Sequence, residues 1–88
     1  MTYQEAIELI NRKQSLIGTR NSQGFNIGAL IVVPANETER EKFFSSYIFT
    51  HNAENAIRPY IESDLEVWAI DTEYLLKANV IFYEKLSI

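Results

Sequence analysis

Residues 27–34 read Ile-Gly-Ala-Leu-Ile-Val-Val-Pro, and residues 65–70 read Leu-Glu-Val-Trp-Ala-Ile. Both stretches are rich in β-branched or aromatic residues, a composition typical of strands. Pro34 ends the first stretch because proline has no N–H to donate to a neighbouring strand. We therefore predict strands over residues 27–33 and 65–70, and the rest of the fold is placed around them.

A helix is predicted on the N-terminal side of these strands, over residues 3–14. Thr2 and Glu5 have the spacing of a capping box, in which each side chain accepts a hydrogen bond from the other residue's backbone N–H. Tyr3, Ala6, Ile7 and Ile10 then recur at helical spacing.

Two further helices are expected between the strands. Asn36 has the side chain of an N-cap and is followed by acidic residues, which suit the first turn of a helix. Residues 45–50 fit either the end of this helix or a strand. A short third helix is predicted from Ala53, Ala56 and Ile57, with Tyr60 left open as a further member. Pro59 limits this helix because it biases Arg58 away from helical geometry.

Additional strands are predicted over residues 16–20 and 80–85, and Asp71 is expected to begin one helical turn through Leu76. Residues 21–24 have turn chemistry, so residues 16–33 are expected to form a β-hairpin in which Gly24 makes the turn. Gly18 and Gly28 are expected where another group packs closely. The resulting order, α-β-β-α-(α)-β-β, predicts a single α+β domain over residues 1–88 with a mainly antiparallel sheet.

Composition narrows the function classes. The 88 residues contain no cysteine, which excludes disulfides and thiolate chemistry within them. We find no secretory signal and no apolar run of membrane-spanning length, so we expect a cytoplasmic protein. The net charge is −4, and residues 37–73 carry nine acidic against three basic residues. This balance disfavours nucleic acid as a partner and suits either a solvated surface or a basic protein.

Candidate chemical groups are few. His51 has only Glu54 as a nearby partner, and this spacing is too common to indicate catalysis or metal binding. Glu62, Asp64 and Glu66 alternate, so an extended segment would place them on one face, as a calcium or magnesium site needs. The same pattern protects an exposed sheet edge from aggregation, and we prefer that interpretation, with Glu66 marking an edge. No cofactor is predicted.

The candidate binding residues are Arg20, in the polar hairpin, and Arg58, Tyr60 and Trp68, whose residue types dominate binding hot spots. If Trp68 points away from the core together with Glu66, then Leu65, Val67 and Ala69 face it. The alternative, in which Trp68 is the largest core residue, is the one that we predict.

Three short stretches, residues 2–10, 59–61 and 67–68, resemble segments of small phage proteins that sequester nucleotide signals in bacterial defence. The glycine–tryptophan segment that follows the first strand in those proteins is absent here. No residue role is therefore carried over.

The sequence favours a non-enzymatic protein-interaction module, homodimeric because a dimer interface would bury further apolar surface of a small domain. The alternative is a small-molecule or nucleotide-binding protein that uses the polar hairpin or Arg58, Tyr60 and Trp68. No catalytic constellation is recognised, so an enzyme is not predicted.

Overall fold

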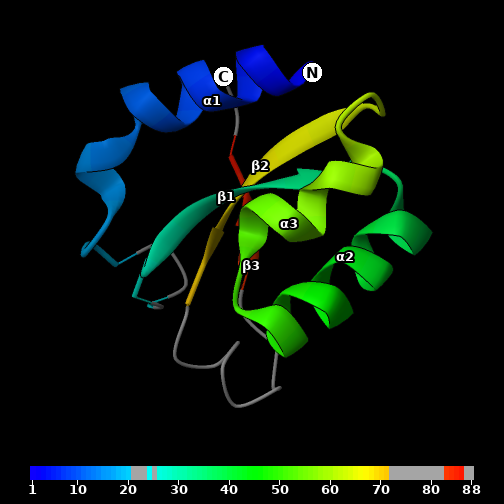
Figure 1. Ribbon diagram of the computed structural model, residues 1–88. Helices are drawn as coiled ribbons and strands as arrows, with labels where there is room; N and C mark the ends of the chain where they lie inside the picture. Colours follow the sequence, from blue (N-terminus) through cyan, green and yellow to red (C-terminus); the bar gives the residue numbers. More distant parts are fainter. Residues whose placement is uncertain (21–23, 25, 72–82, 87–88) are drawn as a thin grey trace.

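A computed structural model describes residues 1–20, 24, 26–71 and 83–86 of the chain. Its helices and strands form an α+β domain, as the sequence predicts (Figure 1). The helices are α1 (Tyr3–Arg12), α2 (Glu37–Thr50) and α3 (Ala53–Ile57), with short 3₁₀ helices η1 (Gln14–Leu16) and η2 (Arg58–Tyr60). The strands are β1 (Ala29–Pro34), β2 (Leu65–Ile70) and β3 (Tyr83–Lys85).

The three strands form one antiparallel sheet in the order β1-β2-β3. Leu30 lies opposite Ala69 and Val32 lies opposite Val67, whereas β3 begins to pair at Ile70. Because β2 lies between the other two strands, the prediction that Glu66 marks an edge is wrong. The residue lies on a central strand and keeps its charge paired, as described below.

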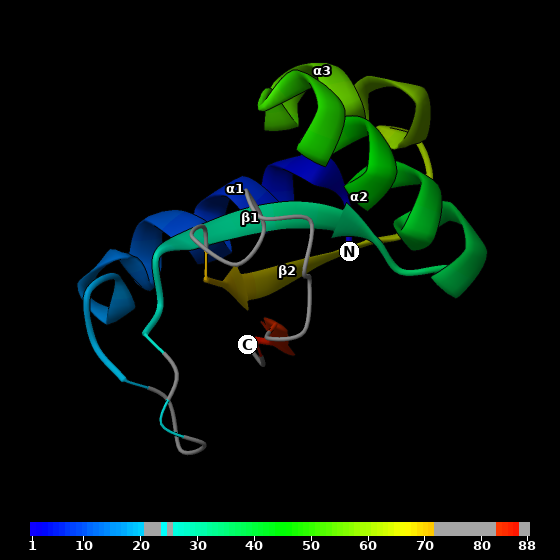
Figure 2. The same cartoon turned by 90° about the horizontal axis from the view of Figure 1, so that it is seen from below.

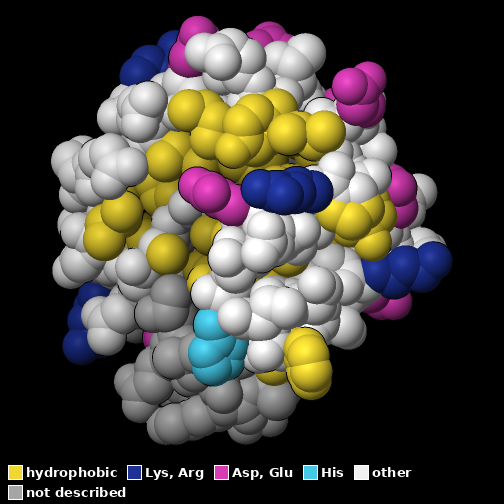
Figure 3. Space-filling view, viewed as in Figure 1, with side chains coloured by type: hydrophobic (Ala, Val, Ile, Leu, Met, Phe, Trp, Pro, Cys, Tyr) yellow, Lys and Arg dark blue, Asp and Glu magenta, His cyan; other side chains and the backbone are white. Residues whose placement is uncertain are grey.

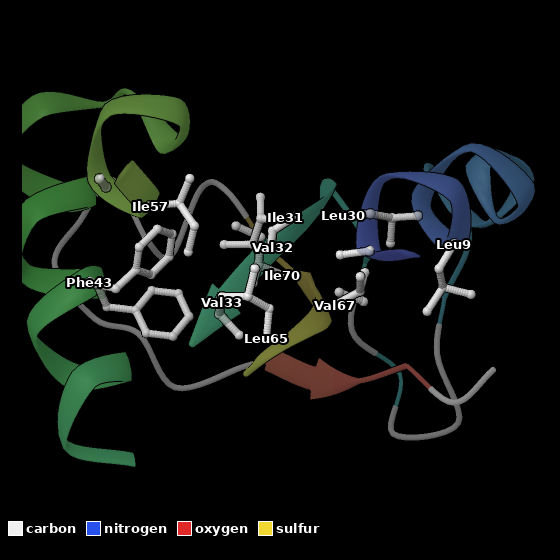
Figure 4. Close-up of a cluster of buried hydrophobic side chains, with 14 of the residues drawn as sticks. Leu9, Leu30, Ile31, Val32, Val33, Phe43, Ile57, Leu65, Val67 and Ile70 are labelled. Carbon is white, nitrogen blue, oxygen red and sulfur yellow. The ribbon is translucent and has the colours of Figure 1, made fainter. Parts of the chain in front are cut away.

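The helices cover both faces of the sheet, with α1 on one side and α2 and α3 on the other (Figures 2 and 4). Because successive side chains of a strand point to opposite faces of the sheet, β1 can contribute to the core on both faces. Leu30 and Val32 lie on the face of α1, and Ile31 and Val33 on the face of α2 and α3. The central part of β1 is buried on both faces, which accounts for its continuous apolar sequence.

Side-chain caps begin both long helices as predicted. In α1 the Thr2 hydroxyl accepts from the Glu5 N–H and the Glu5 carboxylate accepts from the Thr2 N–H. In α2 the Asn36 side chain accepts from the Glu39 N–H. Residues 45–50 are helical, and the preceding turn packs Phe43 against the sheet with no exposed surface.

The strand predicted over residues 16–20 is wrong. The 3₁₀ helix η1 ends at Leu16, and the Thr19 N–H and hydroxyl both donate to the Leu16 carbonyl. Such local bonds compete with strand pairing. The two arms of the predicted hairpin still meet, through the Arg20–Asn26 bridge and through hydrogen bonds from the Gly18 N–H to the Ile27 carbonyl and from the Ile27 N–H to the Thr19 carbonyl, but the described residues 16–20 do not form a strand. Gly18 adopts a positive φ of 88°, a backbone conformation that favours glycine. No atom lies within 4 Å of the position that a Cβ would occupy there, so the close packing predicted at Gly18 is not found.

Arg58 also differs from the prediction, because its backbone is right-handed helical (φ −49°, ψ −45°). The chain changes from α3 to the 3₁₀ helix η2 at this residue, and Pro59 stands near the start of η2, where a missing N–H costs no helical hydrogen bond. In the last predicted strand, residues 83–85 are extended as expected. Residues 80–82, and the turn predicted beyond Asp71, lie outside the described residues.

Candidate functional site

An apolar groove of about 140 Å³ runs along the outer side of β1, between α1 and α3. Leu30 and Val32 point to one face of the sheet and Ile31 to the other, so a groove that touches all three must lie at the strand's outer edge. Figure 3 shows hydrophobic side chains gathered between these two helices, open to solvent. The residues that line it, here called the edge groove, are Tyr3, Ile7, Ile10, Leu30, Ile31, Val32, Ala53, Glu54 and Ile57.

The floor of the edge groove carries backbone groups without partners. The Ala35 N–H donates to the Asp64 carbonyl, and the bonded pairs of an antiparallel ladder recur every second residue. The backbone N–H and C=O groups of Ala29, Ile31 and Val33 therefore point towards β2. Those of Leu30 and Val32 point away from β2, to the outer edge of the sheet. Within the described part of the chain, no hydrogen bond reaches these four groups.

The edge is closed beyond Val32. Pro34 has no N–H, and its carbonyl accepts a hydrogen bond from Arg40 Nη1 at 3.2 Å. A second bond of 2.8 Å joins the same Arg40 nitrogen to the Ala35 carbonyl. At this end of the strand, the backbone groups that can still pair therefore stop at Val32, and at the other end the Gly28 N–H already donates to the Ile70 carbonyl.

Trp68 is half-buried and packs against the core on the face of the sheet that α2 and α3 cover, so it faces inward as predicted without being the largest fully buried residue. Val67 is fully buried on the face of α1, and Trp68 shares the opposite face with Glu66, where it is half-buried. Its Nε1–H donates to Glu66 Oε2 at 2.9 Å, and the Arg40 guanidinium lies over its ring. Glu66 also pairs with Lys85 Nζ at 3.4 Å. The indole thus lies under a polar network that links α2, β2 and β3.

The other predicted binding residues lie apart from this network. Arg20 is exposed at the bridge with Asn26, and the segment that ends at this residue lies at the end of the molecule remote from α3 and η2 (Figure 1). Arg58 is exposed and Tyr60 half-buried, and both lie in η2. The structure therefore does not gather the four residues into one site, and the small-ligand hypothesis stays a prediction.

His51 ends α2 in the left-handed conformation, with φ 55°, and its side chain is exposed. Within the described ranges, no group of three or more His, Cys, Asp or Glu residues is arranged to hold a metal ion. The three alternating carboxylates do not share a strand face, because Glu62 and Asp64 precede β2.

Two carboxylates near the N-terminus have lowered pKa values. The Met1 ammonium donates a hydrogen bond to Asp64 Oδ1, and that bond, followed by the ammonium charge, holds the pKa of Asp64 below its usual 3.8. The hydrogen bonds from Thr2 lower the pKa of Glu5 from its usual 4.5. Met1 also exchanges two backbone hydrogen bonds with Leu65, so these charges fix the start of α1 beside β2.

The edge groove and Arg40 were not predicted from the sequence. The one signal for the groove is the uninterrupted apolar run of residues 29–33, which indicates a strand covered on both faces. Phe49, with 90% of its surface exposed, is a further apolar feature that the helical pattern did not single out.

Comparisons with family models, curated proteins and solved structures give no match for this chain. In the described residues, no helix is both long enough and apolar enough to cross a membrane. The functional argument therefore starts from the geometry of the edge groove.

Proposed function

We propose that this protein is a non-enzymatic, intracellular protein-interaction module that receives an extended polypeptide segment in the edge groove. The observation that carries the proposal is the row of N–H and C=O groups of Leu30 and Val32 at the floor of an apolar groove, with which no described residue pairs. The absence of cysteine from the 88 residues supports an intracellular setting.

The chemistry of the groove favours a strand over other occupants. An unpaired strand edge is a template for another extended chain, which gains main-chain hydrogen bonds from it. Tyr3 and Ile7 line the groove from α1, which lies on one side of the sheet, and Ile57 lines it from α3 on the other side (Figure 4). An added strand would therefore find apolar cover for side chains on both of its faces. A helix or a lipid chain would leave the four backbone groups without partners.

A capped synthetic heptapeptide, Lys-Val-Ile-Val-Ile-Val-Lys, tests the proposal. Nuclear magnetic resonance at the lowest workable protein concentration should show shifted Leu30 and Val32 amide signals and slower exchange of these amides with solvent. The control is the same peptide N-methylated at alternate residues, which has fewer N–H donors and should bind much more weakly. Unchanged Leu30 and Val32 signals, or an equal response to both peptides, would overturn the proposal.

A further inference from the structure

We infer that the edge groove holds one aromatic side chain of the bound segment, a ring with its own N–H or O–H donor, as in tryptophan or tyrosine. The inference rests on the proposed function and adds the chemistry of the residue that anchors the segment. Three properties of the groove support it: the volume, the burial of the lining residues and a single carboxylate at the rim.

The volume of the groove sets the size of the occupant. At about 140 Å³ the groove is close in size to an apolar protein cavity of roughly 150 Å³ that takes up benzene. A row of several side chains exceeds this space, and a single methyl or isopropyl group would leave part of the lining without contacts. One planar ring is the side chain that matches it.

The lining consists of a buried floor and accessible walls. The floor residues are almost fully buried and are Leu30, Ile31, Val32 and Ile57. The wall residues are half-buried and are Tyr3, Ile7 and Ile10 of α1 and Ala53 of α3. Because α1 and α3 lie on opposite sides of the groove, a ring between them contacts both helices at once (Figure 4). The Tyr3 ring also offers an aromatic neighbour for offset or edge-to-face packing.

Glu54 gives the groove a hydrogen-bond acceptor. It is exposed in the first turn of α3 and, apart from Tyr3, is the only lining residue with a polar side chain. Among the described residues, no hydrogen bond or ion pair engages its carboxylate, and Arg58 forms no ion pair with it. A carboxylate only accepts hydrogen bonds, so it favours an occupant with a donor and repels an anion.

The molecule contains the same pairing elsewhere. On the central strand, the Trp68 Nε1–H donates to Glu66 Oε2 at 2.9 Å, which joins an indole to a carboxylate at a half-buried position. Tryptophan and tyrosine combine a large apolar ring with such a donor, and both are enriched among the residues that dominate binding energy. Phenylalanine has the ring without the donor and should therefore bind more weakly.

Indole tests the inference directly, with 1-methylindole as the matched control because it has the same ring but no N–H. Nuclear magnetic resonance should show ring-current shifts of the Ile7, Ile10 and Ile57 methyl signals with both probes. The Kd should be about two- to fivefold lower for indole. Glu54→Ala should abolish this difference, whereas Asn55→Ala, at an exposed residue outside the groove lining, should keep it. Methyl signals that do not respond to indole, or equal Kd values for the two probes, would overturn the inference.

A ring built into the groove tests the location. Ala53→Phe adds a ring to the wall on α3, and Asn55→Phe adds the same ring to the part of α3 outside the lining. With circular dichroism to verify folding, Ala53→Phe should weaken indole binding at least about tenfold relative to Asn55→Phe. Equal Kd values in the two variants would show that indole binds elsewhere and would overturn the assignment to the edge groove.

One change in the heptapeptide separates this inference from the function beneath it. Lys-Val-Ile-Trp-Ile-Val-Lys should bind at least about tenfold more tightly than Lys-Val-Ile-Val-Ile-Val-Lys, because its indole fills the groove. Equal binding, with the Leu30 and Val32 amides still responding, would overturn the aromatic anchor and support the proposed function. A response to indole but to neither peptide would overturn the proposed function and assign the groove to a free aromatic molecule. No response to either peptide or to indole would overturn both.

Discussion

The guanidinium of Arg40 lies over the indole ring of Trp68, with 4.8 Å between Cζ and the ring centroid. The same guanidinium donates hydrogen bonds to the last residues of the β1 edge, at Pro34 and Ala35. One side chain of α2 therefore covers the centre of β2 and also closes the end of the edge groove.

Replacing Arg40 with alanine should lower the free energy of unfolding by about 1–2 kcal/mol. The change removes a cation–π contact and leaves two backbone carbonyls without their charged donor. Trp68 is the only tryptophan, so its fluorescence emission should also move to longer wavelength as water reaches the ring. The control is Lys42→Ala, an exposed position of the same helix. An unchanged emission maximum in Arg40→Ala would show that the ring is not covered in this way.

Local chemistry was sufficient to predict much of the fold. The strand over residues 65–70, the N-caps Thr2 and Asn36 and the α+β class are confirmed, because each follows from neighbouring residues along the chain. The strand predicted over residues 16–20 failed for a local reason as well. The Thr19 N–H and hydroxyl make turn hydrogen bonds to the Leu16 carbonyl that apolar patterning does not reveal.

The error at β2 has a different origin. The alternation of side chains along the strand correctly places Val67 and Trp68 on opposite faces of the sheet. It does not predict which of the two faces the helices cover more completely. Both faces of this sheet carry helices, so Trp68 is half-buried although it does not share the face of Val67. The position of Glu66 at an edge or in the centre likewise depends on strand order, which is set by contacts between distant residues.

The candidate site could not be predicted for the same reason. The edge groove joins parts of three segments, residues 3–10, 30–32 and 53–57, none of which has a binding motif. Its polar feature is backbone, which every residue except proline supplies equally. Whether the backbone groups of Leu30 and Val32 pair with a neighbouring strand depends on the strand order of the sheet, and it cannot be predicted from the identity of the two side chains.

The N-cap of α2 can be tested by changing Asn36 to alanine. Its side chain accepts the Glu39 N–H at 3.0 Å, and the loss of such a cap typically costs about 1 kcal/mol. Asn55→Ala is the matched control, because Asn55 is exposed inside α3 and caps no helix. Urea unfolding followed by circular dichroism should show a clear decrease for Asn36→Ala and a change within about 0.5 kcal/mol for Asn55→Ala. Equal effects would contradict the capping role.

Acidification should destabilise the fold through Glu5 and Asp64. Both pKa values are lowered on folding, so the unfolded chain binds protons first as the pH falls. Their contribution is fully present above the usual pKa of 4.5 for Glu5 and 3.8 for Asp64, and is lost as the pH falls through the lowered folded values. Urea titrations at several pH values should therefore give a shallower acid slope for Glu5→Gln and Asp64→Asn than for the exposed control Glu41→Gln. Identical slopes would rule out this linkage.

Phe43 and Phe49 provide a matched pair, because they lie in the same helix with opposite exposure. Phe43 has no exposed surface, and its ring lies edge-on to that of Phe44 and stacks on that of Tyr47. Phe43→Ala should cost about 3–5 kcal/mol, which a domain of this size can barely tolerate. Phe43→Leu, a milder change, should lower the midpoint of urea unfolding less and leave the slope unchanged. Phe49→Ala, at a residue 90% exposed, should change stability by less than about 0.5 kcal/mol. A comparable loss at both positions would mean that Phe49 is covered in solution.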